Sequence, residues 1–270
     1  MKTYAVPYFT KNKITELTTG EIARFFDWRR QNSKKKAPRE TTIIHESSIL
    51  RTFLNWCFTR GLIEKRIEIE KPKHDGSRRP HFDLKDWNKL VRFLREWVKQ
   101  GVHKSGPIYR DRVMLTNYVL ILSNTGIRVG EARGLRWMDV DSEPANAIDE
   151  ANIILHVSGK TGTREVVSRT GDILTYFERI WDLRCEELGK KPDKTEYVFC
   201  HKDGSPIGSF KKGFAALVSE AGVEIDRDGD KRTIYSLRHT YATFRLQEGV
   251  NHYVLARNMG TSVKMLEQYY

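Results

Sequence analysis

The sequence predicts a protein of two domains that is mainly α-helical with one small β-sheet, an α+β protein. Three observations predict this. Apolar residues recur at helical spacing along most of the 270 residues, and β-branched residues gather at 151–169. The segment EKPKHDGSRRP, at 70–80, is polar and basic without apolar periodicity, which is typical of a linker. We therefore expect a first domain at 1–69, a linker at 70–82 and a second domain at 83–270.

The first domain is predicted to be small and helical. In LTTGEIARFFDWRRQ, at 17–31, a threonine precedes Glu21 in a capping pattern, and apolar residues follow near helical spacing. The stretch at 41–63 repeats this pattern before a stop at Gly61. No helix is evident before residue 13. We expect the apolar face of the second helix to contain Ile44, Ile49, Phe53, Leu54 and Cys57.

The second domain is predicted to open with an amphipathic helix at 82–101. A more apolar helix at 111–126 then ends at Gly126, and β-branched residues on both sides of SGKTGT predict a hairpin. The buried face of the first of these helices is expected to contain Leu90, Phe93, Leu94 and Trp97. Further helices are expected at 171–189, 208–222 and 236–248.

Composition narrows the class of protein. The chain is 39% hydrophobic, and its longest apolar run, YVLIL at 118–122, is far below the roughly 20 residues that span a bilayer. No secretory signal is visible at the start. The three cysteines are an odd number without metal-ligand spacing. These features favour a reduced, cytoplasmic protein.

The positive charge is concentrated at the front of the chain. The net charge is +12, and residues 1–80 hold 18 Lys and Arg against nine Asp and Glu, which leaves +3 for residues 81–270. Such an imbalance indicates contact with a polyanion, most plausibly nucleic acid. A well-solvated basic surface is the alternative explanation.

Four separated segments of the second domain each carry a residue suited to phosphate chemistry. Arg128 follows a glycine at a helix start, Lys160 lies in the hairpin turn, Arg238 lies in YSLRHTYAT, and the chain closes with Tyr269 and Tyr270. Arginine stays protonated and offers a planar fork of donors that matches phosphate oxygens. A tyrosine phenol, with a pKa near ~10, becomes a nucleophile when its proton is withdrawn.

Each of these residues also has a structural explanation. Arg128 could simply pair with Glu131, and Lys160 could be an ordinary exposed turn residue. Tyr270 lies at helical spacing from Val263 and Leu266, so it could be an apolar anchor. The residues taken singly leave these alternatives open.

Together, in this order, the four segments resemble the tyrosine recombinase (phage integrase) family. The family's first arginine box, TGxRxxE followed by LxWxD, matches the chain at 125–139, and its hairpin lysine matches Lys160. Its second box, HxxRH, matches Arg238 and His239. In its closing pattern the nucleophilic tyrosine comes nine residues after Leu-Gly-His, which selects Tyr270 rather than Tyr269. The resemblance covers about residues 83–270.

The resemblance implies a two-domain DNA clamp with a helical core-binding domain and a catalytic domain. Double-stranded DNA would be cut and rejoined through a 3′-phosphotyrosine at Tyr270. Arg128 and Arg238 would hold the phosphate, and Lys160 would protonate the departing 5′-oxygen. No cofactor or metal is implied. The implied assembly is a homo-tetramer on two paired DNA sites, with accessory DNA-bending or directionality factors as further partners, in the nucleoid.

The sequence departs from the family at three places. Tyr235 replaces the first His of HxxRH and Thr261 replaces the His of the closing pattern, and neither is a ready proton acceptor. The proton of Tyr270 could instead leave through His239 or water. Family members usually continue past the nucleophile, whereas Tyr270 is the last residue here, so we expect a truncated reading frame. Two other functions stay open: a DNA-binding relative that cuts nothing, and relaxation of supercoils like a type IB topoisomerase.

Overall fold

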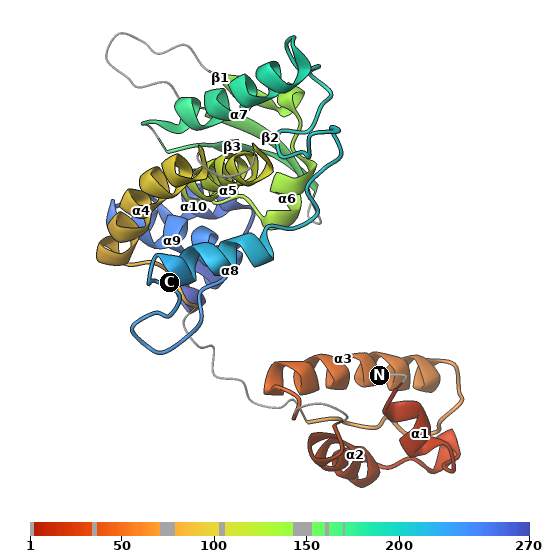
Figure 1. The fold of residues 1–270 in the computed structure, drawn as a ribbon. Coiled ribbons are helices and arrows are strands. Elements are labelled where there is room, and N and C mark those ends of the chain that lie inside the picture. Colours follow the sequence, from red (N-terminus) through yellow and green to blue (C-terminus); the bar gives the residue numbers. More distant parts are fainter. Residues whose placement is uncertain are drawn as a thin grey trace. The chain divides into compact units, whose positions relative to one another are not determined.

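The computed structural model describes residues 3–33, 37–70, 79–102, 106–142, 153–159, 162–169 and 171–270. The chain forms two compact units, Met1–Gly76 and Ser77–Tyr270, which are described separately below (Figure 1). Most of the predicted linker, at 71–78, lies outside the described residues. Within the ranges given above, no helix is long and apolar enough to cross a membrane.

The N-terminal unit is helical, as predicted. It contains α1 (Ala5–Phe9), a 3-10 turn η1 (Ile14–Glu16), α2 (Thr19–Gln31) and α3 (Glu40–Thr59). The hydroxyl of Thr18 accepts a hydrogen bond from the amide of Glu21, and the Glu21 carboxylate accepts one from the amide of Thr18. This reciprocal cap begins α2 where the sequence predicts it. The buried core consists of Ile22, Phe25, Phe26, Ile43, Leu50 and Leu54.

Two expectations for this unit were wrong. Leu54 and Cys57, both expected on the apolar face of α3, are buried as predicted. Ile49 and Phe53 are 43% and 47% exposed, and Ile43 and Leu50 are buried in their place. Consecutive residues of a helix are rotated by about 100° around its axis. A residue one position away from a buried one can therefore face solvent. The short helix α1 was missed because five residues are too few to show a period.

The second unit is mainly helical with one three-stranded sheet, which confirms the predicted fold class. Its strands are β1 (Val140–Ser142), β2 (Ile153–Gly159) and β3 (Gly162–Val167), paired antiparallel in the order β1-β2-β3. The predicted hairpin is β2–β3, and β1 is an addition that three residues could not signal. The helices are α4 (Leu84–Val102), α5 (Gly106–Thr125), α6 (Val129–Gly134), α7 (Ile173–Leu188), α8 (Lys211–Glu220), α9 (Ile234–Gln247), α10 (His252–Met259) and α11 (Val263–Tyr269), with a 3-10 turn η2 (Trp137–Asp139).

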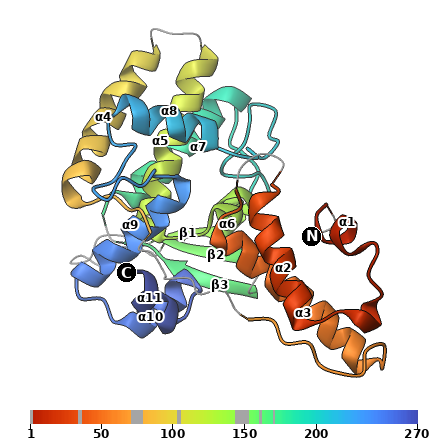
Figure 2. The same cartoon turned by 90° about the horizontal axis from the view of Figure 1, so that it is seen from below.

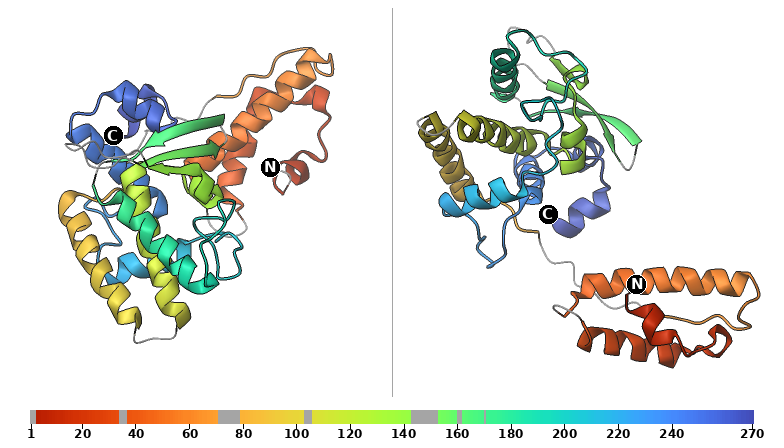
Figure 3. Two further views of the ribbon diagram at one scale, coloured as in Figure 1. Left: turned by 90° about the horizontal axis from the view of Figure 1, so that it is seen from above. Right: turned by 45° about the vertical axis from the view of Figure 1, so that its right-hand side comes forward.

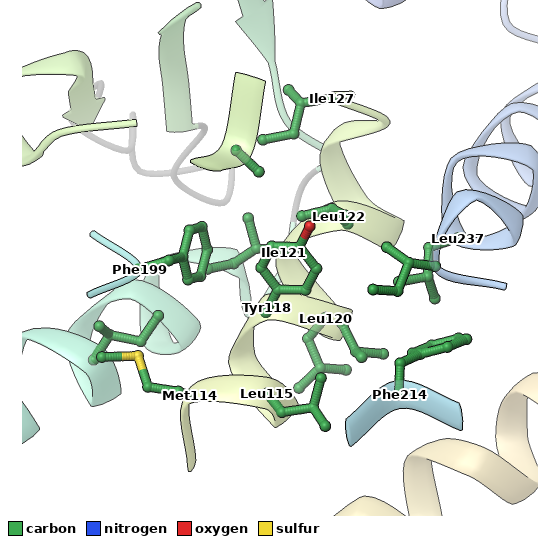
Figure 4. Close-up of a cluster of buried hydrophobic side chains, with 14 of the residues drawn as sticks. Met114, Leu115, Tyr118, Leu120, Ile121, Leu122, Ile127, Phe199, Phe214 and Leu237 are labelled. Carbon is green, nitrogen blue, oxygen red and sulfur yellow. The ribbon is translucent and has the colours of Figure 1, made fainter. Parts of the chain in front are cut away.

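Helix α5 forms the centre of this unit. It packs against α4, α7 and α9, and most of its side chains are buried. Figure 4 shows Tyr118 and Ile121 between Phe199 on one side and Leu237 and Phe214 on the other. Because it is held on several sides, α5 is a rigid support for the loop that follows it, which leads through Gly126 to Arg128.

Helices α9, α10 and α11 form a second, smaller apolar cluster. Its buried members are Tyr241, Ala242, Leu255, Ala256, Met259 and Leu266, and the ring of Tyr270 packs against them. Helix α10 contacts both β3 and α11, and Figure 2 shows these helices beside the β3 edge of the sheet. Figure 3 (left) shows the same neighbours from the opposite side. The chain end is thereby brought next to the sheet and to α9.

Candidate active site

Arg128 stands immediately before α6 and is tied to two elements. Its backbone amide donates to Glu131 Oε2 over 2.8 Å, and its Nη1 donates to Glu131 Oε1 over 2.7 Å. Its Nη2 donates to the backbone carbonyl of Gly260, at the end of α10. The guanidinium therefore points from the loop after α5 toward the turn between α10 and α11.

Arg238, on α9, points to the same turn. It is only 4% exposed, and its two terminal nitrogens donate to the carbonyls of Gly126 and Met259, the latter over 2.7 Å. Burial lowers the pKa of the Arg238 guanidinium, and the positive charge of nearby Arg128 acts in the same direction. The two arginines thus donate to the carbonyls of consecutive residues, Met259 and Gly260.

Gly260 permits this convergence in two ways. Its φ of +62° lies in the left-handed region, where a side chain is strained. A Cβ built on it would also lie 2.8 Å from Cζ of Arg164, so the position has no room for a larger residue. A glycine is therefore required where α10 turns toward α11.

Tyr270 packs its ring against His239. The ring centroids are 5.1 Å apart at an interplanar angle of 39°, and the backbone amide of Tyr270 donates to Leu266 over 3.0 Å as the C-terminal cap of α11. Burial raises the pKa of the Tyr270 phenol, and the charge of Arg238 opposes this shift. The phenol is therefore protonated at neutral pH.

His239 is a neutral, buried histidine. Burial and the charges of Arg79 and Arg238 lower the pKa of His239 to about 3. Neither ring nitrogen has a hydrogen-bond partner among the described residues. Its ring lies between those of Tyr270 and Tyr235, the latter 5.0 Å away in an edge-to-face contact. An imidazole in this state retains a nitrogen lone pair that can accept a proton.

The two residues that depart from the expected pattern lie at the border of this cluster. Tyr235 is 46% exposed at the start of α9. Thr261 follows Gly260, and its backbone amide donates to Ala256 over 2.9 Å. Its side chain lines a shallow open pocket together with Thr163, Arg164 and Ser262.

Lys160 lies outside the described residues, but the strands that hold it are described. Gly159 and Gly162, on either side of residues 160–161, pair as the last rung of β2 and β3. A Cβ on Gly159 would lie 2.8 Å from Oε1 of Glu131. The end of the hairpin therefore abuts the carboxylate that holds Arg128.

One further residue, Arg164 of β3, was not among those expected from the sequence. Its Nη1 and Nη2 donate to the two oxygens of Glu131 over 2.7 and 2.8 Å. Burial by itself would raise the pKa of the Glu131 carboxyl, but the hydrogen bonds from Arg164 and Arg128 lower it to about 2. Arg164 shares a strand face with the buried Val166, and a charged residue at such a position was the signal that could have found it.

In the part of the chain that the structure describes, no group of three or more His, Cys, Asp or Glu side chains could hold a metal ion. Arg128 and Arg238 bring positive charge to this site, where they meet although they are far apart in the sequence. This is the arrangement expected of a phosphodiester site in the family that the motifs resemble. Residues 83–270 match the sequence profile of the phage integrase family. The chain belongs to this family.

Sequence comparison with individual recombinases supports this membership. The chain is 25% identical over 228 residues to tyrosine recombinase XerC of Staphylococcus carnosus, a match that covers 80% of this chain and 65% of that protein. It is 20% identical over 258 residues to tyrosine recombinase XerD of Rickettsia bellii, covering 94% and 79%. The chain thus spans slightly less than two thirds of the XerC relative.

Solved structures of family members share the fold. XerH site-specific recombinase bound to a palindromic difH substrate, in a post-cleavage complex, has a TM-score of 0.74 at 19% identity, covering 99% of this chain and 75% of that chain. The Tn1549 transposon integrase in complex with transposon right-end DNA has a TM-score of 0.70 at 17% identity, covering 100% and 87%. A lambda integrase dimer bound to a core site has a TM-score of 0.61 at 18% identity, covering 100% and 88%.

Proposed function

We propose that this chain is a site-specific DNA recombinase that cuts and rejoins DNA through a covalent 3′-phosphotyrosine at Tyr270. The observation that carries the proposal is the convergence of Arg128 and Arg238 on the consecutive carbonyls of Met259 and Gly260. The turn that accepts these hydrogen bonds leads directly into α11, which ends at Tyr270. Two cations and a nucleophile are therefore held within one small region.

The two arginines are suited to a phosphodiester under attack. Negative charge on the non-bridging oxygens grows as the pentavalent transition state forms, and donors that are already in place stabilise that charge without reorganisation. Nη2 of Arg128 and both terminal nitrogens of Arg238 donate to neutral backbone carbonyls. A phosphate offers charged acceptors, which form stronger hydrogen bonds with arginine than carbonyls do. Bound DNA would therefore compete for the donors of Arg128 and Arg238.

The reaction exchanges one phosphoester bond for another. The phenol oxygen of Tyr270 attacks phosphorus, the bond to the 5′-oxygen breaks, and the leaving oxygen takes a proton, which we assign to Lys160 as general acid. The proton of the phenol must go to an acceptor. His239 contacts the ring of Tyr270 and has an unused nitrogen lone pair, but its lowered pKa makes it a weak base, so water is the second candidate acceptor. Attack by a 5′-hydroxyl on the phosphotyrosine reverses these steps and rejoins the strand.

The partners we propose are double-stranded DNA and three further copies of the chain, which would form a tetramer on two paired sites. Accessory DNA-bending or directionality factors fit the same scheme. The basic residues of 1–80 would contact the backbone, so affinity should fall steeply with salt. We place the 1–69 and 83–270 segments as the two halves of a clamp joined at 70–82. The working location would be the nucleoid, in the cytoplasm.

The test uses nicked duplex substrates that lose the short fragment carrying the 5′-hydroxyl, so that cleavage traps protein on DNA. The duplexes are taken from sequences flanking the gene. Wild-type chain, Tyr270→Phe and the matched control Tyr269→Phe are compared on a denaturing gel. We expect a covalent band that only Tyr270→Phe abolishes.

Other outcomes would change the assignment. DNA binding on a native gel without any covalent band would indicate a relative that binds DNA and cuts nothing. Relaxation of supercoiled plasmid without a sequence requirement would indicate the topoisomerase activity. Loss of the band in Tyr269→Phe and not in Tyr270→Phe would mean that the nucleophile has been misassigned.

A further inference from the structure

Helix α11, which leads to Tyr270, is short and has little of its surface buried. It contains seven residues, and of these Leu266 is buried. A helix of two turns is marginal in water by itself, so contacts made outside the helix decide how firmly its last turn is placed. The half-buried side chain of Tyr269, in that last turn, is therefore important for the nucleophile that follows it.

Arg79 contacts this side chain from the start of the second unit. Its Cζ lies over the ring of Tyr269, 5.2 Å from the ring centroid. A guanidinium within about 6 Å of an aromatic centroid is attracted to the negative face of the ring. The contact thus joins the first described residue of this unit to the end of α11.

The chain that follows Arg79 is firmly fixed. Phe82 is fully buried, and its amide donates to the hydroxyl of Thr240 over 2.9 Å. Arg232 donates from Nε to the carbonyl of His81 over 2.9 Å, and its guanidinium lies over the ring of Phe82. Thr240 belongs to α9, so the backbone that presents Arg79 is attached to the same helix as the second arginine of the site.

The charge of Arg79 also acts on the centre of the site. Burial is the main cause of the lowered pKa of His239, and the charge of Arg79 is the next cause. Burial raises the pKa of Tyr270, and the charges of Arg238 and Arg79 oppose this rise. Because such effects weaken with distance, Arg79 lies near both His239 and Tyr270 as well as against Tyr269.

An exposed arginine at this place could have two roles. Its five N–H donors could bind a DNA phosphate directly. Alternatively, it could act through the ring that it covers, by holding the last turn of α11 in place. The structure favours the second role, because the contact with Tyr269 is formed and the next residue is the proposed nucleophile.

We propose that Arg79 is a positioning residue that attaches the last turn of α11, through the ring of Tyr269, to the fixed segment at 79–83, and thereby holds Tyr270 in place for attack. This inference rests on the proposed function. It adds a residue that lies outside the four motif segments. Its effect on cleavage has to pass through the ring of Tyr269.

A double-mutant cycle separates action through Tyr269 from direct action on DNA. Arg79→Met removes the charge and keeps an unbranched side chain, whereas Tyr269→Leu removes the aromatic face. If Arg79 acts through the ring, Arg79→Met slows cleavage in the wild-type background and has no effect in the Tyr269→Leu background. If Arg79 binds a phosphate, the loss is the same in both backgrounds.

The matched control is Arg179→Met on α7. Arg179 is also exposed, and its Cζ lies 5.6 Å from the ring centroid of Tyr176, so this substitution removes the same kind of contact from another helix. Single-turnover cleavage is measured on nicked suicide substrates, which trap the covalent product, with DNA saturating. Affinity is measured on native gels at several salt concentrations.

We expect Arg79→Met to slow cleavage by about threefold to tenfold, which corresponds to the loss of one partly buried cation–π contact. Tyr269→Leu should slow cleavage at least as much, and the double variant should be no slower than Tyr269→Leu alone. Arg79→Lys keeps a cation over the ring and should recover most of the rate. The salt dependence of DNA binding should not change, and Arg179→Met should cleave like wild type.

Equal losses in the two backgrounds would overturn the inference. A salt dependence that is weaker by about one phosphate contact would then assign Arg79 to the DNA backbone. An unchanged rate in Arg79→Met, or the same loss in Arg179→Met, would also overturn it.

Hydrogen exchange of the α11 amides, measured on the protein alone, tests the attachment apart from cleavage. We expect faster exchange in Arg79→Met than in wild type, and no further increase when Arg79→Met is added to Tyr269→Leu. If wild type cleaves and Arg79→Met changes neither exchange nor rate, only this inference fails. If wild type forms no covalent product, the proposed function fails even where exchange responds, and the role of Arg79 in cleavage fails with it.

Discussion

Arg128 and Arg238 donate hydrogen bonds to the backbone carbonyls of two consecutive residues, Gly260 and Met259. One arginine follows α5 and the other lies within α9, so packing of these helices brings the two guanidinium groups together. The shared turn continues into α11 and Tyr270. The position of the chain end is in this way linked to both arginines.

Replacement of Arg128 should impair cleavage far more than DNA binding. Arg128→Lys keeps one positive charge but loses the fork that spans Glu131 and Gly260, and we expect cleavage to fall on the order of 10²- to 10³-fold. Arg133→Lys, on the exposed side of α6, is the control and should stay near wild type. The measurement is covalent product on suicide substrates beside a native-gel binding curve. A matching loss of binding would show that the arginine serves affinity rather than the transition state.

His239 should make stability depend on pH between 6.5 and 4.5. Its pKa falls from 6.5 to about 3 on folding, so in this range the unfolded chain binds a proton that the folded chain does not, and stability rises with pH. The contribution of His239 to the free energy of unfolding is complete above about pH 6.5 and is lost as the pH falls toward 3. Glu131, with its pKa lowered to about 2, contributes only below about pH 4.5, which leaves this window to histidine.

The measurement is urea unfolding of wild type and His239→Asn at pH 6.5 and 4.5. Between the two pH values, the free energy of unfolding should fall by about 2–3 kcal/mol more in wild type than in the variant. This is the energy expected when the unfolded state binds one more proton than the folded state over two pH units. Equal losses in the two proteins would mean that His239 is already accessible to protons in the folded state.

Gly260 and Gly249 provide a matched pair for testing the crowding at the turn. Both have positive φ, +62° and +80°, but a Cβ on Gly249 meets no atom within 4 Å, whereas one on Gly260 meets the guanidinium of Arg164. Alanine at Gly249 should cost about 1–2 kcal/mol in the free energy of unfolding, from backbone strain alone. Gly260→Ala should cost more and should also slow cleavage, because Arg164 is held by three hydrogen bonds and cannot move aside freely. Similar effects of the two substitutions would argue against that crowding.

The assignment of the buried face of α3 can be checked with two neighbouring residues. Leu54→Ala removes a buried side chain and should destabilise the N-terminal unit by about 2–5 kcal/mol. Phe53→Ala removes a side chain that is 47% exposed and stacks on Trp56, and should cost under about 1 kcal/mol. Hydrogen-exchange protection of the α2 and α3 amides in urea measures both. A cost at Phe53 as large as that at Leu54 would restore Phe53 to the buried face, as expected from the sequence.

Features that depend on near neighbours in the chain were predictable from the sequence. The cap between Thr18 and Glu21, the apolar face of α4 and the β2–β3 hairpin all follow from residues a few positions apart. The motif spacings were sufficient to identify the family. The phase of α3 was not predictable, because Ile49 and Leu50 are equally apolar and only the packing partner decides which one is buried.

The sequence by itself therefore determined most of the longer helices, the family and the residues that could act on a phosphate. Only the tertiary structure decided that Arg164 and Arg128 share the carboxylate of Glu131, and that His239 lies against Tyr270 without a hydrogen-bond partner among the described residues. The physical reason is the separation in sequence between the residues that interact. Periodicity and capping report interactions within a few residues, whereas these contacts join segments that meet only when α5, α9, α10 and the sheet have packed.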